Sequence, residues 1–590
     1  MIDVLVVGVY FIFLIIIGFL FKSFTKSTSD YFRGGGKMLW WMVGSTAFMT
    51  QFSAWTFTGA AGKAFDDGWS VAIIFFANAL GYFMNYLFFA QKSRQMRVIT
   101  PIEGIRQRFG KVSEQVFTWG TIPSSILQAG IWLNGLAIFT TAVFGIDMDQ
   151  TIILTGIVVL IMSVTGGSWA VVASDFVQMI IIMVVTFIST IVAIFKAGGI
   201  SVIMVKGMPE NPITGSGINY SFLFIAWFVC IFTKQFFSTN NMIDSYRYIC
   251  AKDSKNAKKA ALLACLLMTI GPFIWFMPAW FVAAFYSDTT TWGINGLGNK
   301  IKDATYLVFM RKEMPIGMVG LMMSAMFAAT MSSMDSALNR NAGIFVKNFY
   351  TIFIEKNISD KKALIISKIA TLIFGLIIIG TGLFLNSLKH LSLFNAMMYV
   401  GTLISFPLLI PSLLGFFIKK TPDWAAWGTV LVGLFVSYCV SFVIKPTMIQ
   451  SLFNLVEPLS KREVSDLTVT LGIIGHIFIT GGFFVCSQFF YRGLSENRQQ
   501  EVNKFFSNVE TPVLSDNLPE ETDFKQRIIL GRLIQVFGLA ISIMFLIPKD
   551  INGKLIYTFM SCIMLLIGTL LVKAGKQNLE LEPSPLKTNL

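Results

Sequence analysis

A run of small and hydroxyl-bearing residues, AATMSSMDS, places oxygen atoms on one face of a predicted helix. Ala329, Ser332, Ser333 and Ser336 are spaced i, i+3, i+4 and i+7, and a helix brings residues at this spacing onto one side. Serine hydroxyls and a helix carbonyl supply only oxygen ligands, which hard cations prefer. Because none of these four residues is a carboxylate, the pattern favours a weakly held, exchangeable cation such as Na⁺.

Two aspartates accompany this hydroxyl cluster within apolar sequence. Asp335 precedes Ser336, and Asp175 lies in a separate apolar segment. Serines by themselves favour close packing between membrane helices. Carboxylates at membrane depth are costly and usually face the interior of a bundle or a watery cavity. With two aspartates present, a cation site becomes the better interpretation.

A second unusual stretch is TQFSAWTFTGAAGKAF, residues 50–65, which interrupts an apolar segment with hydroxyls, an amide and glycines. A similar polar interruption, TKQFFSTNN, ends an apolar segment five segments later. We expect both to be breaks in helices that open two five-helix halves. Unwound carbonyls at such breaks bind cations in many secondary transporters.

The elements that must position these groups are membrane helices. Of the 590 residues, 55% are hydrophobic and 13% are charged, and apolar runs long enough to cross a bilayer recur along the chain. The alternation typical of membrane β-strands is absent, so the fold class is all-α integral membrane. We predict about fifteen spans, at residues 3–21, 39–62, 69–91, 115–144, 150–165, 167–195, 217–238, 258–286, 316–346, 363–385, 392–418, 424–444, 467–490, 527–547 and 552–573.

The net charge of +14 is explained by the loops. With the N-terminus placed outside, most lysines and arginines fall on the opposite side, which is the positive-inside pattern. The predicted location is therefore the plasma (inner) membrane, with the N-terminus outside and the C-terminus cytoplasmic. The partners are the lipid bilayer and small molecules, and no nucleic acid is expected. Residues 3–21 lack a cleavage site and are predicted to be a retained span.

Several chemistries are disfavoured by composition. The six cysteines show neither a disulfide framework nor zinc spacing. Only His390 and His476 are present, which disfavours a histidine metal site or a catalytic triad. No nucleophile with a neighbouring base is recognisable, so we expect no enzyme and no organic cofactor.

Several segments together resemble the sodium:solute symporter family. They are SDYFRGGGKMLWWMVGSTAF, TPIEGIRQRFG, TGGSWAVVASDFVQ, FFSTNNMIDSYRYICAKDSKNAKKAA and AATMSSMDSALN. The resemblance covers roughly residues 1–490 and implies a LeuT-type fold of five plus five inverted helices. It divides the chain into a first helix and loop (1–37), a ten-helix core (38–418), two further helices (419–490), a cytoplasmic polar loop (491–526) and two C-terminal helices with a short tail (527–590).

The resemblance also implies where ions bind. The main Na⁺ site would use the carbonyls of Met49, Phe52 and Ala329 and the hydroxyls of Ser332 and Ser333. A possible second Na⁺ or proton site would use Asp175, Ser332, Asp335 and Ser336. Asp335 stands where the family usually has serine, so stronger cation binding, a proton and a structural ion pair all stay open for it.

By the same resemblance, the solute pocket lies beside the broken helices. Its implied lining is Gln51, Trp55, Thr56, Asn78, Asn85, Gln128, Trp132, Thr233, Lys234, Phe237, Asn395 and Tyr399. The sugar-transporting members have a Glu-Gln pair where this chain has Trp55 and Thr56, and the SAW triplet (residues 53–55) is more similar to proline-type members. Lys234 is a possible counter-charge for a carboxylate, and snorkelling or pairing with an aspartate stays open.

The resulting prediction is a Na⁺-coupled symporter of a small organic solute that works by alternating access. An amino acid or other small carboxylate is favoured over a sugar, and a Na⁺-coupled sugar or polyol symporter is the alternative. A solute sensor or an uncoupled facilitator is disfavoured, because no signalling module follows and the hydroxyl cluster is present. The solute, the Na⁺ stoichiometry and the oligomeric state are left open by the sequence.

Overall fold

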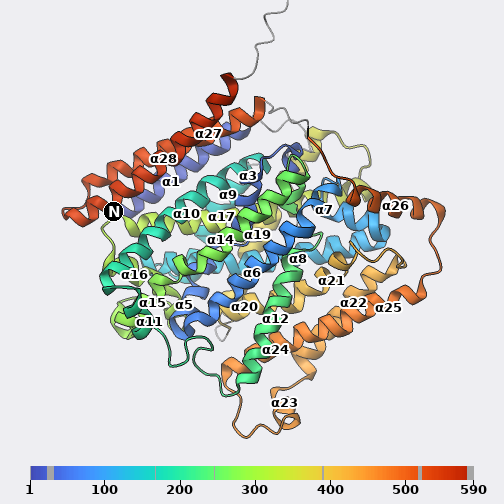
Figure 1. Cartoon of the computed structure of the whole chain (residues 1–590), viewed down its shortest axis with the longest axis horizontal. Coiled ribbons are helices and arrows are strands. Elements are labelled where there is room, and N and C mark those ends of the chain that lie inside the picture. Colours follow the sequence, from blue (N-terminus) through green and yellow to red (C-terminus); the bar gives the residue numbers. More distant parts are fainter. Residues whose placement is uncertain are drawn as a thin grey trace, which may run out of the picture.

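The computed structural model describes residues 2–22, 32–165, 168–244, 246–388, 391–515 and 521–580. In these residues every regular element is a helix, and the single β-bridge, between Met38 and Ala251, forms no strand. The all-α prediction is confirmed (Figure 1). His390 and the predicted tail after residue 580 lie outside the described residues.

The first half of the bundle comprises α1 to α13. Its helices are α1 (Ile2–Lys22), α3 (Trp40–Thr50), α4 (Ala54–Phe57), α5 (Gly59–Asp67), α6 (Ala72–Met84), α7 (Ala90–Gln95), α8 (Pro101–Phe144), α9 (Met148–Thr165), α10 (Ser168–Ala197), α11 (Ile200–Lys206), α12 (Ser221–Thr239) and α13 (Tyr246–Ile249). A π-helical segment, Asn85–Phe89, joins α6 to α7.

The second half comprises the remaining helices. They are α14 (Ser254–Trp275), α15 (Met277–Phe285), α16 (Thr305–Glu313), α17 (Met318–Ile344), α18 (Thr351–Phe353), α19 (Asp360–Ser387), α20 (Leu393–Tyr399), α21 (Phe406–Leu414), α22 (Trp424–Tyr438), α23 (Pro446–Leu452), α24 (Lys461–Gly475), α25 (Gly482–Cys486), α26 (Glu496–Glu510), α27 (Glu521–Ile543) and α28 (Ile551–Glu580).

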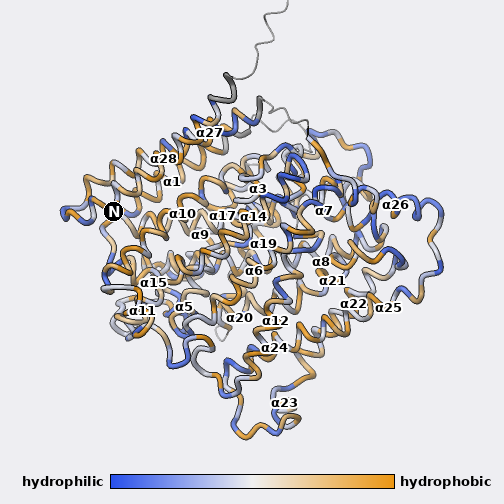
Figure 2. Tube along the Cα trace, viewed as in Figure 1, coloured by the Kyte–Doolittle hydropathy of each residue, from blue (hydrophilic) through white to orange (hydrophobic). Residues whose placement is uncertain are grey.

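Apolar helices dominate the bundle (Figure 2). Among the described residues, 11 helices are long and apolar enough to cross a membrane, and Ile2–Ile17 and Met148–Val164 are shorter apolar helices. The hydroxyl-rich α17 and the short α3 are not among the 11. Each predicted span contains helix, and the count of about fifteen crossings stays a prediction.

The first predicted break is present, whereas the second predicted stretch, residues 233–241, is helical up to Thr239. The second predicted span is divided into α3, α4 and α5, with non-helical residues 51–53 between the first two. α12 ends at Thr239, residues 240–244 form turns, and α13 begins at Tyr246. Polar residues therefore mark the break between α3 and α4 and the end of α12, whereas Gly59 and Gly62 lie within α5.

α8 begins earlier than predicted, at residue 101 instead of 115. Thr100 caps it by accepting a hydrogen bond from Glu103 N at 3.4 Å, and Pro101 fits the first turn, where its missing N–H costs nothing. Gly110 has φ 82° and divides the helix into two parts. A residue with a side chain adopts that conformation only at a cost, so glycine is required at this kink.

The broken helix that begins with α3 lies in the middle of the bundle, whereas α12 packs mainly against α6 and α24. α3 packs against α10, α14 and α17, and α17 also packs against α1, α8 and α9. α27 and α28 run side by side along one edge next to α1, whereas α22, α24 and α25 lie at the opposite edge (Figure 1). The helix break is thereby shielded on several sides.

Candidate functional site

The break after α3 is held open by hydroxyl groups. Ser53 caps α4 by accepting a hydrogen bond from Trp55 N at 3.3 Å. Thr330 of α17 accepts a hydrogen bond from Ala54 N at 3.1 Å. Helix termini leave backbone N–H groups without partners, and these two hydroxyls satisfy the first of them. Sequence reasoning missed Thr330, although it lies within the AATMSSMDS run.

The predicted main ion site is assembled at this break. Ser333 Oγ lies 3.1 Å from the carbonyl oxygen of Met49 and 2.6 Å from that of Phe52. Ser332 and Ala329 lie on the same buried helix, and Ser332 Oγ makes no hydrogen bond of good geometry in the described residues. A buried hydroxyl beside two backbone carbonyls at a helix break supplies the oxygen ligands that a hard cation prefers.

Asp175, from the predicted second site, also lies near the break. Its carboxylate accepts a short hydrogen bond from Thr46 Oγ1 of α3. The other carboxylate oxygen has no partner among the described residues, and Ser332 lies beside it. Asp175 and Ser332 are thus brought together as predicted.

Ser336 is in a different environment, because Arg247 reaches it. Arg247 Nη2 donates a short hydrogen bond to Ser336 Oγ, and Arg247 Nε lies 3.4 Å from Thr50 Oγ1. Arg247 is 3% exposed and its Nη1 makes no hydrogen bond in the described part of the chain. A fixed guanidinium therefore occupies the neighbourhood where a second cation was predicted. The sequence signal was an arginine inside the quoted FFSTNNMIDSYRYIC segment.

Asp335 lies on another face of α17. It accepts a short hydrogen bond from Ser163 of α9, and it lines a cavity with residues of α1, α9 and α10. Ser333 faces α3 and Ser336 faces Arg247 of α13, whereas Ser332 lies beside Asp175 of α10. The four residues predicted for the second site therefore do not form one cluster, because successive helical positions point in different directions.

A separate cavity of about 100 Å³ adjoins the break. Six of the residues predicted for the solute pocket line it: Gln51, Trp55, Asn78, Gln128, Trp132 and Lys234. The remaining lining was not predicted for the pocket and is Ser53, Ile74, Phe75, Gln235, Ser238, Asp244, Met397, Met398, Gly401, Ser405 and Leu409. Gln51 and Ser53 belong to the break itself, so the cavity and the predicted ion site share a backbone segment.

The other six predicted pocket residues do not line this cavity. Asn85 Nδ2 donates to Thr239 O at 2.5 Å, Thr233 Oγ1 donates to Val229 O at 3.0 Å, and Tyr399 Oη donates to Ser465 Oγ at 3.1 Å. The Phe237 ring lies 5.4 Å from that of Phe406. Thr56 is buried in α4, and Asn395 lies in the first turn of α20, where its N–H donates to Ser392 Oγ at 3.1 Å.

Among the residues that the structure describes, Lys234 is the one lysine that lines this cavity. It is 7% exposed, and its only hydrogen-bond contact in the described residues is Met398 Sδ at 4.0 Å. Asp244, the carboxylate of the same lining, is paired with Arg340 at 3.1 Å. No carboxylate in the described part of the chain forms an ion pair with Lys234. A buried charge without a counter-charge is costly, which points to an anionic ligand.

The cavity is closed on the α20 side by Trp55. Its Nε1 donates to Leu393 O at 3.3 Å, and its ring stacks on Phe394 with centroids 5.8 Å apart. Gln128 Nε2 donates to Ser405 Oγ at 2.9 Å on the other side. These contacts join the broken helix and α8 to the segment containing α20 and α21.

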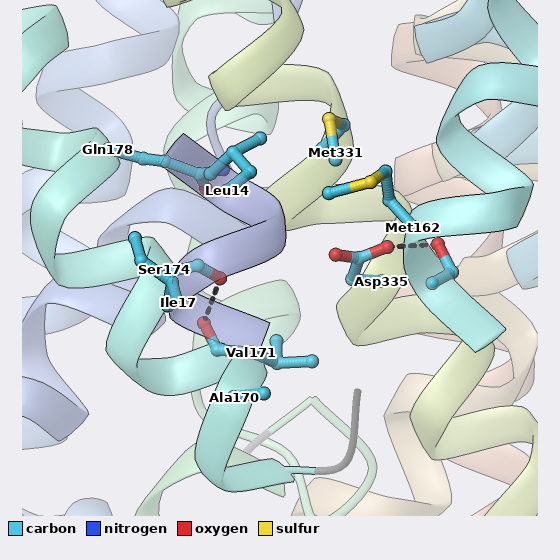
Figure 3. Close-up of a pocket in the computed structure, with 10 residues that line it drawn as sticks. Leu14, Ile17, Met162, Ala170, Val171, Ser174, Gln178, Met331 and Asp335 are labelled. Carbon is cyan, nitrogen blue, oxygen red and sulfur yellow. Dashed lines mark hydrogen bonds between the residues drawn. The ribbon is translucent and has the colours of Figure 1, made fainter. Parts of the chain in front are cut away.

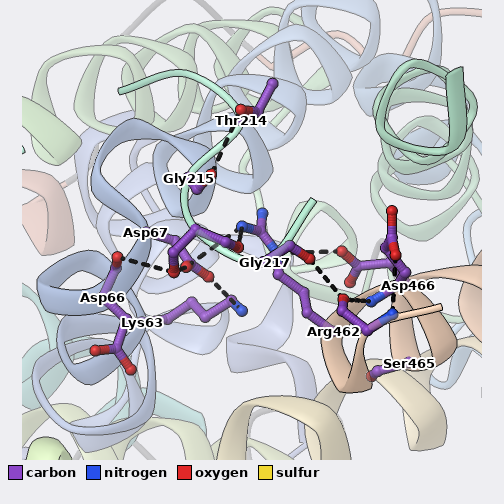
Figure 4. Close-up of polar contacts among 12 residues, drawn as sticks. Lys63, Asp66, Asp67, Thr214, Gly215, Gly217, Arg462, Ser465 and Asp466 are labelled. Atoms are coloured by element: carbon purple, nitrogen blue, oxygen red, sulfur yellow. Dashed lines mark hydrogen bonds and ion pairs between the residues drawn. The ribbon is translucent and has the colours of Figure 1, made fainter. Parts of the chain in front are cut away.

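The far end of the broken helix is fixed by charges. Arg462 of α24 lies 3.3 Å from Asp67 Oδ1 and 3.4 Å from Asp466 Oδ2, and Lys63 forms a short ion pair with Asp67 (Figure 4). These side chains are largely buried, so the pairs are weakly screened by solvent. The cluster joins α5 to α24.

Comparisons with known proteins agree with this architecture. A family model described as Sodium:solute symporter family matches residues 31–433. The chain is 24% identical over 436 residues to the Sodium/sialic acid symporter SiaT of Proteus mirabilis (strain HI4320), covering 72% of this chain and 86% of the relative. It is 25% identical over 495 residues to the Sodium/glucose cotransporter of Vibrio parahaemolyticus, covering 77% and 88%.

Among solved structures, that of a Na⁺-coupled sialic acid symporter in a substrate-bound outward-open state matches with a TM-score of 0.66 at 20% identity. The match covers 82% of this chain and 98% of that chain. This likeness shows that the fold is the LeuT type. The family and these relatives are transporters, not enzymes. The chain is therefore a multi-pass membrane transporter that belongs to the sodium:solute symporter family.

Proposed function

We propose that this chain couples the downhill entry of Na⁺ to the uptake of a small organic solute by alternating access. The observation that carries the proposal is the position of Ser333 Oγ against the carbonyls of Met49 and Phe52 at the helix break. The same break supplies Gln51 and Ser53 to the solute cavity. An ion that orders the break thereby also orders part of the solute's surroundings.

The mechanism follows from this shared segment. Na⁺ held by Met49, Phe52, Ala329, Ser332 and Ser333 fixes the unwound backbone between α3 and α4. A ligand shifts a conformational equilibrium only by its differential affinity for the two states. Because the ion and the solute bind the same ordered conformation of the break, each ligand increases the population of the conformation that the other binds. Both ligands are released when the opposite side of the transporter opens.

The membrane potential adds to the driving force. We place the N-terminus outside and the C-terminus in the cytoplasm of the plasma (inner) membrane, on the basis of the basic loops. Each charge that moves inward contributes about 2.3 kcal/mol per 100 mV. That free energy corresponds to a concentration ratio of about 50.

For the solute, we propose an amino acid or another small carboxylate. The unpaired ammonium of Lys234 supplies the counter-charge for a carboxylate, and the amide groups of Gln51, Asn78 and Gln128 offer further hydrogen bonds. The relatives are named for sialic acid and for glucose, so relatives with neutral solutes occur as well. A Na⁺-coupled sugar or polyol symporter is the alternative, and Lys234 argues against it.

Removal of one ion ligand tests the proposal. Ser333→Ala should raise the Na⁺ concentration for half-maximal uptake into proteoliposomes by about tenfold, because losing one polar ligand of a charged group costs about 1.5 kcal/mol. Ser324→Ala is the matched control: Ser324 lies on the same helix and donates only to Gly320 O at 2.9 Å. Unchanged Na⁺ dependence in Ser333→Ala, with normal expression, would remove the site assignment.

A further inference from the structure

A cavity of about 480 Å³ lies where α8, the start of α22 and α26 meet. It shares no residue with the solute cavity or with the cavity beside Asp335 (Figure 3). Its size is within the range of cavities that bind small molecules. The charged side chains that line it are Arg106, Lys111, Asp423, Arg498 and Glu501.

The cavity lies at the ends of two apolar helices, where the membrane surface is expected. Trp424 begins an apolar helix, Trp424–Val443, that is long enough to cross a membrane. Gly110 marks the kink at which the polar first part of α8 passes into its apolar part. Trp424 and Trp427 both line the cavity, and tryptophans concentrate where lipid meets water. Figure 2 shows α26 as mostly hydrophilic and α22 as mostly hydrophobic, so the cavity borders both environments.

An apolar stripe continues from the cavity along α22. Trp427, Leu431 and Phe435 are spaced by four residues, which places them on one face of the helix. Leu431 is 54% exposed and Phe435 is 65% exposed. In a helix that spans the membrane, exposed apolar side chains face the acyl chains of the lipid. The cavity and the stripe therefore offer a polar site with an apolar extension, as a phospholipid requires.

The two carboxylates of the lining are held by arginines. Arg498 Nε and Nη2 each lie 3.1 Å from the carboxylate of Asp423, and Arg498 Nη1 donates a short hydrogen bond to Glu501. The buried guanidinium of Arg108 also acts electrostatically on Asp423. Two positive charges therefore compensate two negative charges on the α26 side of the cavity.

On the α8 side of the cavity a positive charge remains. Arg106 Nε lies 3.7 Å from Glu114, and the ammonium of Lys111 acts on the same buried carboxylate, so two positive charges face a single negative charge. Lys111 is exposed and forms no ion pair within 4.0 Å in the described part of the chain. This surplus favours an anionic ligand, and both lysine and arginine bind phosphate.

We infer that this cavity binds the headgroup of an anionic phospholipid, with Lys111 and Arg106 on its phosphate and its acyl chains along the stripe on α22. Basic pockets between spanning helices bind such headgroups. A headgroup in this position contacts both the kink of α8 and the start of α22, so it stabilises the junction between the two helices. The site requires neither Na⁺ nor the transported solute.

Native mass spectrometry of the purified protein with defined lipids tests this inference. Phosphatidylglycerol should bind more tightly than phosphatidylcholine of the same chain length. Lys111→Gln should weaken phosphatidylglycerol binding about fivefold, and Lys111→Arg should retain it. The matched control Lys259→Gln, which removes an exposed lysine of α14 outside the cavity, should bind the lipid as wild type does. Equal binding of the two lipids, or equal binding by wild type and Lys111→Gln, would overturn the inference.

A second readout needs no variant. Phosphatidylglycerol that carries a diazirine on its acyl chain should label the peptide that contains Leu431 and Phe435 after illumination, and labelling confined to other helices would refute the assigned position. Glycerophosphoglycerol has the same headgroup without acyl chains, and at equal concentration it should not displace the lipid. Displacement would show that the cavity holds a soluble phosphate compound and would refute the lipid site.

Discussion

Lys234 carries a charge into the solute cavity that nothing in the described part of the chain neutralises. Lys234→Gln should weaken stabilisation by small carboxylates at least tenfold in apparent Kd, because hydrogen bonds to charged groups contribute about 1.5–3 kcal/mol. Thermal-shift titrations in saturating Na⁺ measure this. Neutral polyols should be unaffected, and Lys255→Gln, an exposed lysine of α14, is the control. If the apparent affinity falls equally for carboxylates and for polyols, Lys234 stabilises the fold and does not bind the carboxylate.

Asp303 provides a pH-dependent test outside the membrane spans. Burial raises its pKa to about 7, Lys300 opposes the shift, and Asp66 adds to it. Gly62 of α5 lies directly against its carboxylate. Because the native state keeps a proton that the unfolded state loses near pH 4, wild-type stability should fall as pH rises from about 4 to 7.

Asp303→Asn should remove that slope. Above pH 7 it should be more stable than wild type by about 1–3 kcal/mol, a value reduced for partial solvent screening. Melting temperatures of both proteins between pH 4 and 8 measure the difference. Parallel pH profiles would mean that Asp303 is already ionised in the folded protein.

The residues of the ion site could be predicted better than those of the solute pocket. The family resemblance implied Met49, Phe52 and Ser333 together, and these residues do lie together at the break between α3 and α4. The solute cavity depends on how α6, α8, α12 and the segment after α20 face one another. Asn85 donates a hydrogen bond to Thr239 O and Tyr399 donates one to Ser465 Oγ, so neither side chain faces the cavity. The spacing of residues along the sequence does not predict these contacts between helices.

Among the elements, the broken helix depends on a hydroxyl from α17. Thr330→Val should leave Ala54 N–H without a partner and cost about 1–2 kcal/mol, whereas Thr330→Ser should retain wild-type stability. Thermal unfolding with and without Na⁺ compares the three proteins, and part of the loss should be recovered at high Na⁺ because the ion orders the same segment. If the Thr330→Val variant is as stable as wild type, another group must accept the hydrogen bond from Ala54 N.

Apolar spans and the break between α3 and α4 were predictable, whereas most helix ends and the kink in α8 were not. Length and hydropathy located the helices, yet the start of α8 at Pro101 depends on a cap by Thr100, and its kink depends on Gly110. The predicted polar loop 491–526 contains α26, whose Val502, Phe505, Phe506 and Val509 are buried. Their i, i+3, i+4, i+7 spacing was a helical signal within a mostly polar sequence. Residues 516–520 of that loop lie outside the described residues.

At the scale of the whole molecule, α26 contacts parts of the bundle that are distant in sequence. Arg498 of α26 lies 3.1 Å from Asp423, and Arg97, just after α7, donates to Asn508 O at 2.9 Å. At the other end of the broken helix, Arg462 joins α5 to α24. Alternating access requires rearrangement of contacts of this kind on one side at a time, while the break between α3 and α4 stays in the middle.

The central claim is that Na⁺ at the helix break completes the solute site. The most direct measurement is a thermal-shift screen of the purified wild-type protein against amino acids, organic acids and sugars, with Na⁺ and with K⁺ in its place. A ligand that binds the native state raises its melting temperature. The account predicts a small carboxylate that stabilises the protein in Na⁺ and not in K⁺. A solute that stabilises it equally in both salts would contradict the account.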